Sequence, residues 1–284
     1  LIMYGWMSVA ILLGILTYTF ATVHGLNIGI TSSTKVASTT SNDNNFRHLH
    51  PQHNVIVVGG SSGMGKAVAL SVLQRGGRIL LISRSEEKLK QAKYELEQQV
   101  PNAIIFIQSC DVSDEEQVQK LAGSLEQNYN SNIKIDDDDD EQYNNMNGGN
   151  VIWDALVITA AGRAPHGPML SLPTFETRSM MESKVWTAYH CAKYLSPILR
   201  RGGAVVFVAG ILNRRPGLNC VPLAMTNGAL EGLTVSLALE WGPQLRVNCL
   251  SPGFCNTERF NHMDPIRRQQ MLENTASSLP LQRV

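Results

Sequence analysis

Short apolar runs alternate with longer amphipathic segments from residue 54 onward. The runs have the length of buried strands, and the segments between them carry apolar residues at helical spacing. Strands and helices that alternate in this way predict a doubly wound parallel sheet in a three-layer αβα fold, with its ligand beyond the carboxyl ends of the strands. The expected strands are 55–58, 78–83, 103–108 and 153–158, and the expected helices are 66–73, 85–100 and one that begins at 113.

A glycine-rich turn joins the first strand to the first helix. Its glycines let backbone N–H groups and the positive end of the helix approach a pyrophosphate, which a Cβ at Gly59, Gly63 or Gly65 would obstruct. The turn therefore predicts a Rossmann-type dinucleotide site. Lys66, just after the turn, is expected to be solvated. The predicted cofactor contacts in the turn are Gly59, Ser61, Ser62, Gly63, Met64 and Gly65.

The end of the second strand bears on the choice of cofactor. An acidic residue there would accept hydrogen bonds from the ribose hydroxyls of NAD and repel the 2′-phosphate of NADP. This chain has Arg84 there, between Ser83 and Ser85, which favours NADP(H) over NAD(H). In an alternative interpretation, Arg84 stacks over the adenine or caps the strand.

The order of these features resembles the short-chain dehydrogenase/reductase family, in its classical branch, over residues 54–284. The resemblance rests on the glycine turn, on Asp111-Val112, on Thr159-Ala160-Ala161-Gly162 and on the segment 246–253, which reads RVNCLSPG. It implies NAD(P) binding, with Asp111 holding the adenine amino group or serving as a turn residue. Further cofactor contacts that it implies are Val112, Ala160, Ala161, Gly162, Asn227, Pro252 and Gly253.

The catalytic positions of that family carry unusual residues here. Leu223 stands at the tyrosine position and Asn227 at the lysine position, while Gly210 stands at the serine position. Lys184 aligns with the family's asparagine. Because a positioned proton-transfer group typically contributes about a hundred- to ten-thousandfold in rate, the usual mechanism is expected to be lost. One hypothesis is that Lys184 replaces the tyrosine; the alternative is a lysine that merely extends along a helix face.

Other candidates for chemistry are few. His166 and the segment 213–215 are expected on loops at the substrate edge of the sheet, where a solvent-facing role is the simpler interpretation. No Cys-x-x-Cys or paired-histidine spacing occurs, so no metal site is predicted. The formal net charge is zero and no basic patch stands out, so nucleic acid is not an expected partner.

The first 30 residues are predicted to be a hydrophobic membrane anchor or, alternatively, a signal segment. No Lys, Arg, Asp or Glu occurs before Lys35, and the stretch 7–23 is apolar enough to span a bilayer. Residues 31–53 are expected to form a flexible tether. Five cysteines without a disulfide-like spacing suggest a reducing compartment, so the domain is expected to face the cytosol; the alternative is the secretory pathway after signal cleavage.

Two features depart from a standard domain of this kind. Residues 129–150 contain a run of aspartates and an Asn/Gly-rich tail, which predict a disordered acidic insertion. After the segment 246–253 only a helical pattern follows, so six strands are expected, without the seventh strand with which members of that family continue. Either this is the native end of the chain or the sequence is a fragment. The helices at about 174–199 and 223–241 are expected to support a homodimer or homotetramer.

Three functions remain open at this point. The first is an NADP-dependent oxidoreductase with a rearranged site and a small carbonyl or alcohol as substrate. The second is a catalytically inactive NADP(H)-binding sensor. The third is a membrane-tethered scaffold. The resemblance favours the oxidoreductase class, while Gly210, Leu223 and Asn227 argue against its usual proton transfer.

Overall fold

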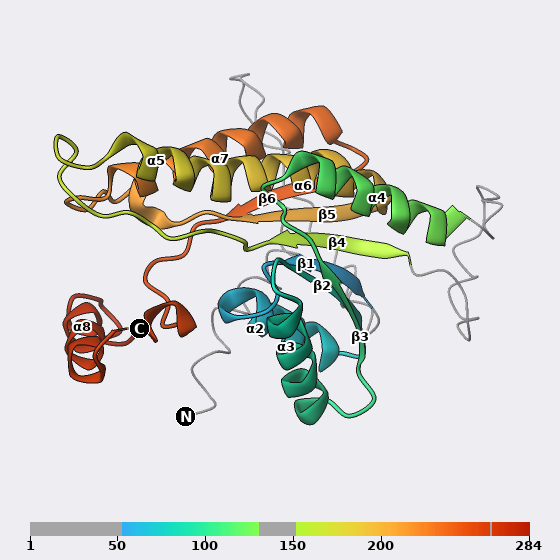
Figure 1. Ribbon diagram of the computed structural model, residues 1–284, viewed down its shortest axis with the longest axis horizontal. Coiled ribbons are helices and arrows are strands. Elements are labelled where there is room, and N and C mark those ends of the chain that lie inside the picture. Colours follow the sequence, from blue (N-terminus) through green and yellow to red (C-terminus); the bar gives the residue numbers. More distant parts are fainter. Residues whose placement is uncertain (1–52, 131–151, 262) are drawn as a thin grey trace, which may run out of the picture.

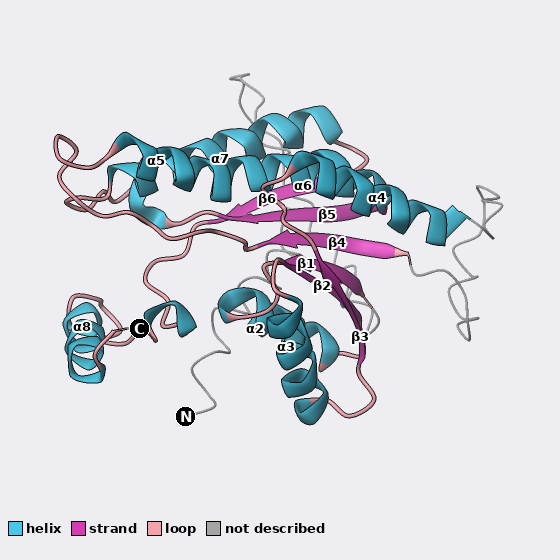
Figure 2. Ribbon diagram, in the orientation of Figure 1, coloured by secondary structure: helices cyan, strands magenta, loops and turns pink. Residues whose placement is uncertain are grey.

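The computed structural model describes residues 53–130, 152–261 and 263–284. A six-stranded parallel sheet forms its centre, with the strand order β3-β2-β1-β4-β5-β6 (Figure 2). This is the predicted doubly wound arrangement, with the order reversing between β1 and β4. The strands are β1 (Asn54–Val58), β2 (Arg78–Ser83), β3 (Ile104–Ser109), β4 (Trp153–Ile158), β5 (Leu199–Val208) and β6 (Arg246–Leu250).

Helices cover the two faces of the sheet (Figure 1). The helices α2 (Gly63–Leu73) and α3 (Glu86–Gln99) pack below β1 to β3, and α4 (Glu115–Asn130), α6 (Thr187–Leu195) and α7 (Val221–Trp241) lie on the opposite face. Successive residues of β1 serve both cores, since Ile56 belongs to one cluster and Val57 to the other. Fully burying such a side chain stabilises the fold by about 1.5–3 kcal/mol.

The helical region predicted at about 174–199 is helical from Thr174 to Ile198 and consists of four contiguous elements. It consists of α5 (Thr174–Met181), a π-helical turn η2 (Glu182–Trp186), α6 and a short 3-10 turn η3 (Ser196–Ile198), and β5 then begins at Leu199. A π-helical turn inside a helix often marks a functional position, and Lys184 lies at the middle of this one.

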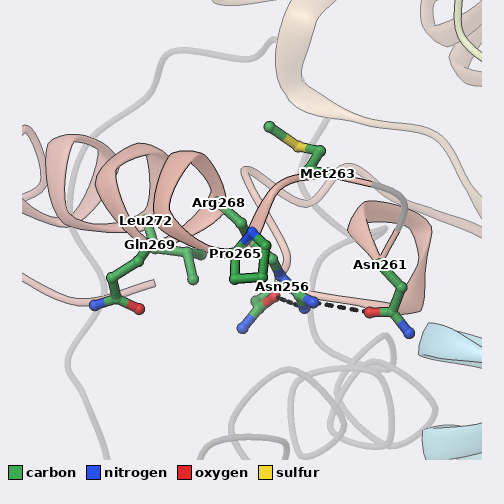
Figure 3. A pocket seen from close by; sticks show the side chains of 7 residues that line it. All are labelled: Asn256, Asn261, Met263, Pro265, Arg268, Gln269 and Leu272. Carbon is green, nitrogen blue, oxygen red and sulfur yellow. Dashed lines mark hydrogen bonds between the residues drawn. The ribbon is translucent and has the colours of Figure 1, made fainter.

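The C-terminal arm, residues 256–284, leaves the sheet after β6. It contains the short turn η5 (Glu258–Phe260) and the helix α8 (Pro265–Ser277), and α8 has no buried residue. Figure 1 shows α8 standing apart from both helix layers. A cavity of about 330 Å³ opens within the arm (Figure 3). It is lined by Asn256, Asn261, Met263, Pro265, Arg268, Gln269 and Leu272.

Several predicted segments lie outside the described residues. The proposed anchor at 1–30 and nearly all of the tether at 31–53 belong there, as does most of the acidic insertion. The boundary predicted for that insertion is wrong by two residues, because α4 continues through Asn130. Within the described ranges, no helix combines the length and the apolar character needed to cross a membrane.

Candidate functional site

The glycine turn holds the end of β1 against the end of β4. Gly59 has a φ of +83°, and a Cβ there would lie 2.7 Å from the backbone nitrogen of Ala160. The hydroxyl of Thr159 donates to the carbonyl of Val58 at 3.0 Å, which fixes the same contact. A Cβ at Gly65 would collide with the backbone of Gly59. Gly59 and Gly65 are thus required by the packing of the turn itself, in addition to any need of a bound pyrophosphate.

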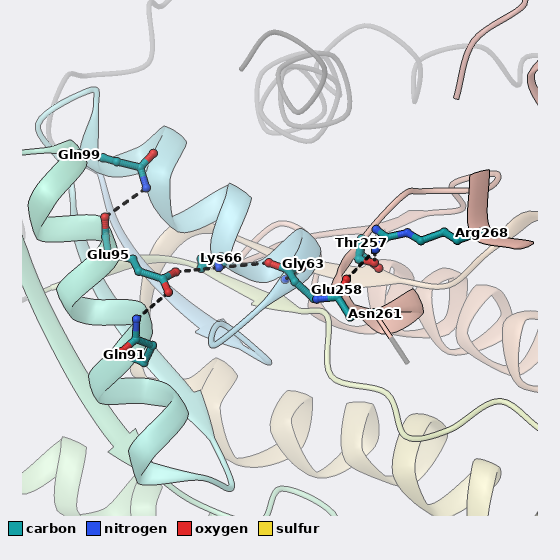
Figure 4. Close-up of polar contacts among 9 residues, drawn as sticks. All are labelled: Gly63, Lys66, Gln91, Glu95, Gln99, Thr257, Glu258, Asn261 and Arg268. Atoms are coloured by element: carbon teal, nitrogen blue, oxygen red, sulfur yellow. Dashed lines mark hydrogen bonds and ion pairs between the residues drawn. The ribbon is translucent and has the colours of Figure 1, made fainter. Parts of the chain in front are cut away.

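The amino end of α2 carries an anion in this structure. The Glu258 carboxylate accepts a hydrogen bond from the backbone N–H of Gly63 at 2.8 Å through Oε2 (Figure 4). Its Oε1 lies 3.1 Å from Nζ of Lys66. A helix amino terminus beside a lysine is a favourable place for negative charge, so this end of α2 fits the diphosphate of a dinucleotide.

Lys66 is not the solvated residue that the sequence suggested. Its Nζ also lies 2.9 Å from Glu95 on α3, and its side chain is only 26% exposed. Burial alone lowers the pKa of Lys66, but the hydrogen bonds to Glu95 and Glu258 outweigh burial and raise it. Lys66 therefore stays charged and joins α2 to both α3 and the C-terminal arm.

The predicted adenosine-binding residues gather at the ends of β2 and β3. Ser61 donates to Ser83 at 3.1 Å, and Ser85 caps α3 by accepting from the backbone N–H of Lys88 at 3.2 Å. Arg84 is exposed, and its guanidinium makes no hydrogen bond or ion pair with the described residues. Asp111 accepts from the Ser113 hydroxyl at 2.7 Å through Oδ1, so one of its carboxylate oxygens serves a turn.

Three of the four predicted catalytic positions meet in one buried cluster. Lys184 is 6% exposed, and its Nζ donates to Oδ1 of Asn227 at 2.6 Å and to the carbonyl of Ala209 at 2.9 Å. Asn227 is 1% exposed, and a Cβ at Gly210 would lie 2.9 Å from its Nδ2. The small residue at 210 therefore makes room for the Asn227 amide. A buried ammonium needs such acceptors, because its transfer from water is otherwise very costly.

The remaining predicted residues line the same edge of the sheet. Gly162 lies against Ser183 of η2, since a Cβ at Gly162 would collide with that side chain. Pro252 accepts a hydrogen bond from the backbone N–H of Ile211 at 3.0 Å, which holds the segment after β6 beside Gly210. Leu223 is half-buried on the first turn of α7. Ala161 and Gly253 are exposed, and Val112 is buried in the core.

Two contacts at this edge were missed by sequence reasoning. His166 and Cys220 approach each other, with 3.5 Å between Nδ1 and Sγ, although only His166 had been considered for chemistry. The backbone N–H of Gly167 donates to the carbonyl of Asn219 at 3.1 Å, which ties the loop after β4 to the start of α7. The contact of Glu258 with α2 was also missed, since 195 positions separate Gly63 from Glu258. No local pattern reveals pairs at such a separation.

The cavity in the C-terminal arm lies between the segment around η5 and α8. None of its lining residues is a predicted cofactor or catalytic residue, so it does not define the reaction site. In the described part of the chain, no group of three or more His, Cys, Asp or Glu side chains is arranged to hold a metal ion.

Comparisons with known proteins agree with the fold. Residues 53–136 match the family described as short chain dehydrogenase, and residues 152–284 match the one described as Enoyl-(Acyl carrier protein) reductase. Carbonyl reductase family member 4 of Danio rerio is 30% identical, over 72% of this chain and 76% of its own. The NADPH-dependent reductase BacG of Bacillus subtilis (strain 168) is 24% identical, over 80% and 83% of the two chains.

Solved structures give the same result. A small-chain dehydrogenase in complex with NADPH has a TM-score of 0.58 and 25% identity, covering 82% of this chain and 84% of its own. An NADPH-bound short-chain oxidoreductase of Pseudomonas aeruginosa, described as containing an atypical catalytic center, has a TM-score of 0.68 and 24% identity, with 82% and 84% covered. The described fold, the glycine turn and these matches show that the chain belongs to the short-chain dehydrogenase/reductase family of NAD(P)-dependent oxidoreductases.

Proposed function

We propose that this protein is an NADP(H)-dependent oxidoreductase that interconverts a small carbonyl compound and its alcohol at a rearranged active site. The observation that carries the proposal is the buried contact of Lys184 with Asn227, 2.6 Å long, at the carboxyl edge of the sheet. The bound cofactor would supply or accept the hydride. The residues of this chain would bind it, orient the substrate and stabilise the charge that develops on the substrate oxygen.

Lys184 and Asn227 form an exchanged pair in this proposal. The family resemblance implies asparagine at 184 and lysine at 227, whereas this chain has the two residue types the other way round. One amino group and one amide therefore remain in direct contact beside Gly210. In this proposal the amino group of Lys184 is protonated and supplies a single positive charge there. A fixed cation in a water-poor site stabilises a developing oxyanion far better than it would in water. Lys184 would thus provide the electrostatic stabilisation that the family's tyrosine, here Leu223, cannot provide.

NADP(H) is proposed as the cofactor, in preference to NAD(H), because of Arg84. Its exposed guanidinium stands at the end of β2, where a ribose 2′-phosphate is expected, and Ser83 and Ser85 flank it. Gly63, Met64 and Gly65, at the start of α2, would bind the diphosphate through backbone N–H groups. The amide of Asn227 would hydrogen-bond a ribose hydroxyl. Two relatives described as NADPH-dependent or NADPH-bound support the choice.

A second candidate function is NADP(H) binding without turnover. Leu223 and Gly210 have no group that can transfer a proton, and Lys184 donates hydrogen bonds to the protein atoms Ala209 O and Asn227 Oδ1. A sensor of the cofactor would need the binding half of the site alone. It would bind NADPH with the same preference and show no oxidation of the cofactor with any carbonyl compound.

Self-association and membrane attachment are proposed as properties of the whole protein. The outer face of α7 exposes Val235 (71%) and Leu239 (86%), and η2 and α6 expose Trp186 (46%) and Tyr189 (41%). Apolar side chains at these levels of exposure suit a dimer or tetramer interface. We also propose that residues 1–30 anchor the protein in a membrane, with the domain on the cytosolic side.

Titration of the protein with NADPH and NADH, followed by fluorescence or calorimetry, tests the cofactor assignment. Saturable binding that favours NADPH is expected, and a screen of aldehydes and ketones for NADPH oxidation then separates the two candidate functions. A folded protein that binds neither nucleotide would contradict both the oxidoreductase and the NADP(H) sensor. The membrane-tethered scaffold would then be the remaining function.

A further inference from the structure

The carboxylate of Glu258 has both oxygens engaged at the place where a cofactor diphosphate is expected. Oε2 accepts from the N–H of Gly63 at 2.8 Å, and Oε1 lies 3.1 Å from Lys66 Nζ (Figure 4). The carboxylate therefore uses two of the groups that favour an anion at a helix amino terminus, a backbone donor and a cation. Ser62 precedes Gly63 and makes no side-chain cap, so no nearer side chain fills this position.

The charges around this position disfavour the binding of a second anion while Glu258 is in place. Lys66 is the cation of an ion-pair group with two carboxylates, since Nζ contacts Glu95 at 2.9 Å as well as Glu258. Burial alone raises the pKa of Glu258, but its hydrogen bonds and the charge of Lys66 outweigh burial and lower it, so it is ionised at neutral pH. An incoming diphosphate would meet this negative charge at van der Waals distance, and the two anions cannot share one N–H group.

Glu258 also links the amino end of α2 to the C-terminal arm. Arg268 on α8 donates to Asn261 at 2.8 Å and to Asn256 at 2.6 Å, which holds α8 to the segment around η5. A Cβ at Gly63 would lie 3.5 Å from the Thr257 side chain, so this segment rests directly on the start of α2. Because α8 buries no residue, the contacts of Glu258 are the main polar attachment of the arm to α2 among the described residues.

We propose that Glu258 is an internal anion that competes with the cofactor diphosphate for the amino end of α2. When the diphosphate displaces it, Lys66 exchanges the Glu258 carboxylate for the phosphate oxygens and becomes a cofactor ligand. Cofactor binding thereby detaches residues 256–284 from α2. The proposal rests on the function proposed above, since the external anion that it names is a dinucleotide.

The size of the effect follows from the exposure of the pair. The Glu258 side chain is 42% exposed and that of Lys66 26%, so solvent screens much of their attraction. A competing internal contact of this kind reduces the apparent affinity by the fraction of time for which it is closed. Removing the charge of Glu258 should therefore tighten binding roughly two- to fivefold, as for a partly exposed ion pair.

The test uses the full chain and two probes, NADPH and inorganic pyrophosphate, titrated by calorimetry. Glu258→Gln should bind both probes about two- to fivefold more tightly than the unmodified protein, and Lys66→Met should bind both more weakly by a similar factor. Glu273→Gln, which removes a carboxylate of α8 that accepts a hydrogen bond from Gln269 on the same helix, is the matched control and should change neither affinity. Equal affinities for Glu258→Gln and the unmodified protein would overturn the proposal.

Failure of the proposed function gives a different result. If no variant binds NADPH but pyrophosphate follows the expected order of affinities, the competition by Glu258 stands and the cofactor assignment is wrong. If NADPH binds to all variants alike, the cofactor assignment stands and the competition is wrong.

Limited proteolysis of the unmodified protein gives a second test. It uses no variant, so its result does not depend on whether a variant folds. Trypsin cleavage after Arg267 and Arg268 should become several times faster when pyrophosphate is added, because the arm is released. In the control, a chloride salt of the same cation replaces the pyrophosphate at equal ionic strength. An unchanged cleavage rate at saturating pyrophosphate would contradict the release of the arm.

Discussion

The ammonium of Lys184 and the side-chain oxygen of Asn227 lie 2.6 Å apart in a buried setting, next to a glycine that leaves room for the amide. Lys184 comes from a π-helical turn and Asn227 from the second turn of α7, so the contact joins two helices of the same layer. The pair places one amino group and one amide at the buried end of the site. Its energetic coupling and its chemical role can be measured separately.

Replacing Asn227 with leucine should destabilise the protein. Lys184 would lose an acceptor while its charge stays buried, and an unsatisfied buried polar group costs about 1–3 kcal/mol of folding free energy. Urea unfolding of Asn227→Leu, Lys184→Met and the double variant measures this cost. The double variant should be more stable than the sum of the single effects predicts, with a coupling of about 0.5–3 kcal/mol. Strictly additive effects would contradict a direct interaction.

Gly210→Ser should be destabilising, although it restores the residue type that the family resemblance implies. The new Cβ would lie 2.9 Å from Nδ2 of Asn227, so the buried amide or the backbone must move. Such overpacking typically costs about 1–3 kcal/mol. Gly253→Ser is the matched control, because nothing lies within 4 Å of a Cβ at that position. A thermal unfolding midpoint that falls equally in both variants would refute the explanation.

Arg84→Ala should weaken NADPH binding and leave NADH binding nearly unchanged. A hydrogen bond from a charged group contributes about 1.5–3 kcal/mol, which corresponds to roughly a ten- to hundredfold change in Kd. Arg78→Ala, at the opposite end of β2, controls for the loss of one positive charge. Calorimetric titration with each nucleotide checks the result. Equal losses for NADPH and NADH would assign Arg84 to the adenine rather than to a phosphate.

The cysteines should differ strongly in their reaction with iodoacetamide at pH 8. Burial raises the pKa of Cys110 to about 11 and raises that of Cys191 as well, so both remain protonated thiols well above neutral pH. Cys220 is half-buried beside His166 and should be alkylated first. Mass spectrometry of the folded protein identifies the site, and Cys220→Ser should remove the fast phase. Early labelling of Cys191 would show that α6 opens readily.

The sequence was sufficient for the parts of the fold that local patterns determine. The runs at 55–58, 78–83 and 153–158 are strands in the structure, because each is apolar enough to be buried on both faces. The family alignment also selected Lys184, Gly210 and Asn227, which the structure brings together. The alignment selected these residues by their positions in the sequence. It could not show that Lys184 and Asn227 form a hydrogen bond, because sequence spacing does not give distances between side chains.

Contacts between distant segments could not be predicted. Glu258 and Gly63 are neither periodic nor part of a shared motif, so their hydrogen bond follows only from the path of the chain after β6. Lys66 was misjudged for the same reason, because its partners lie on α3 and in the C-terminal arm. The predicted helical region at about 174–199 matches α5, η2, α6 and η3 to within one residue, but its periodicity did not reveal the π-helical turn.

Turnover by a Lys184 variant tests the central claim most directly. Once a carbonyl substrate is found in the NADPH screen, kcat and the NADPH Kd are measured for the unmodified protein, Lys184→Met and Lys193→Met. Lys193 lies on α6 and pairs with Glu115 at the surface, which makes it a matched lysine outside the site. We expect Lys184→Met to lose about a hundredfold or more in kcat while it still binds NADPH, and Lys193→Met to behave as the unmodified protein. Full turnover by a folded Lys184→Met protein would contradict the assigned role of Lys184.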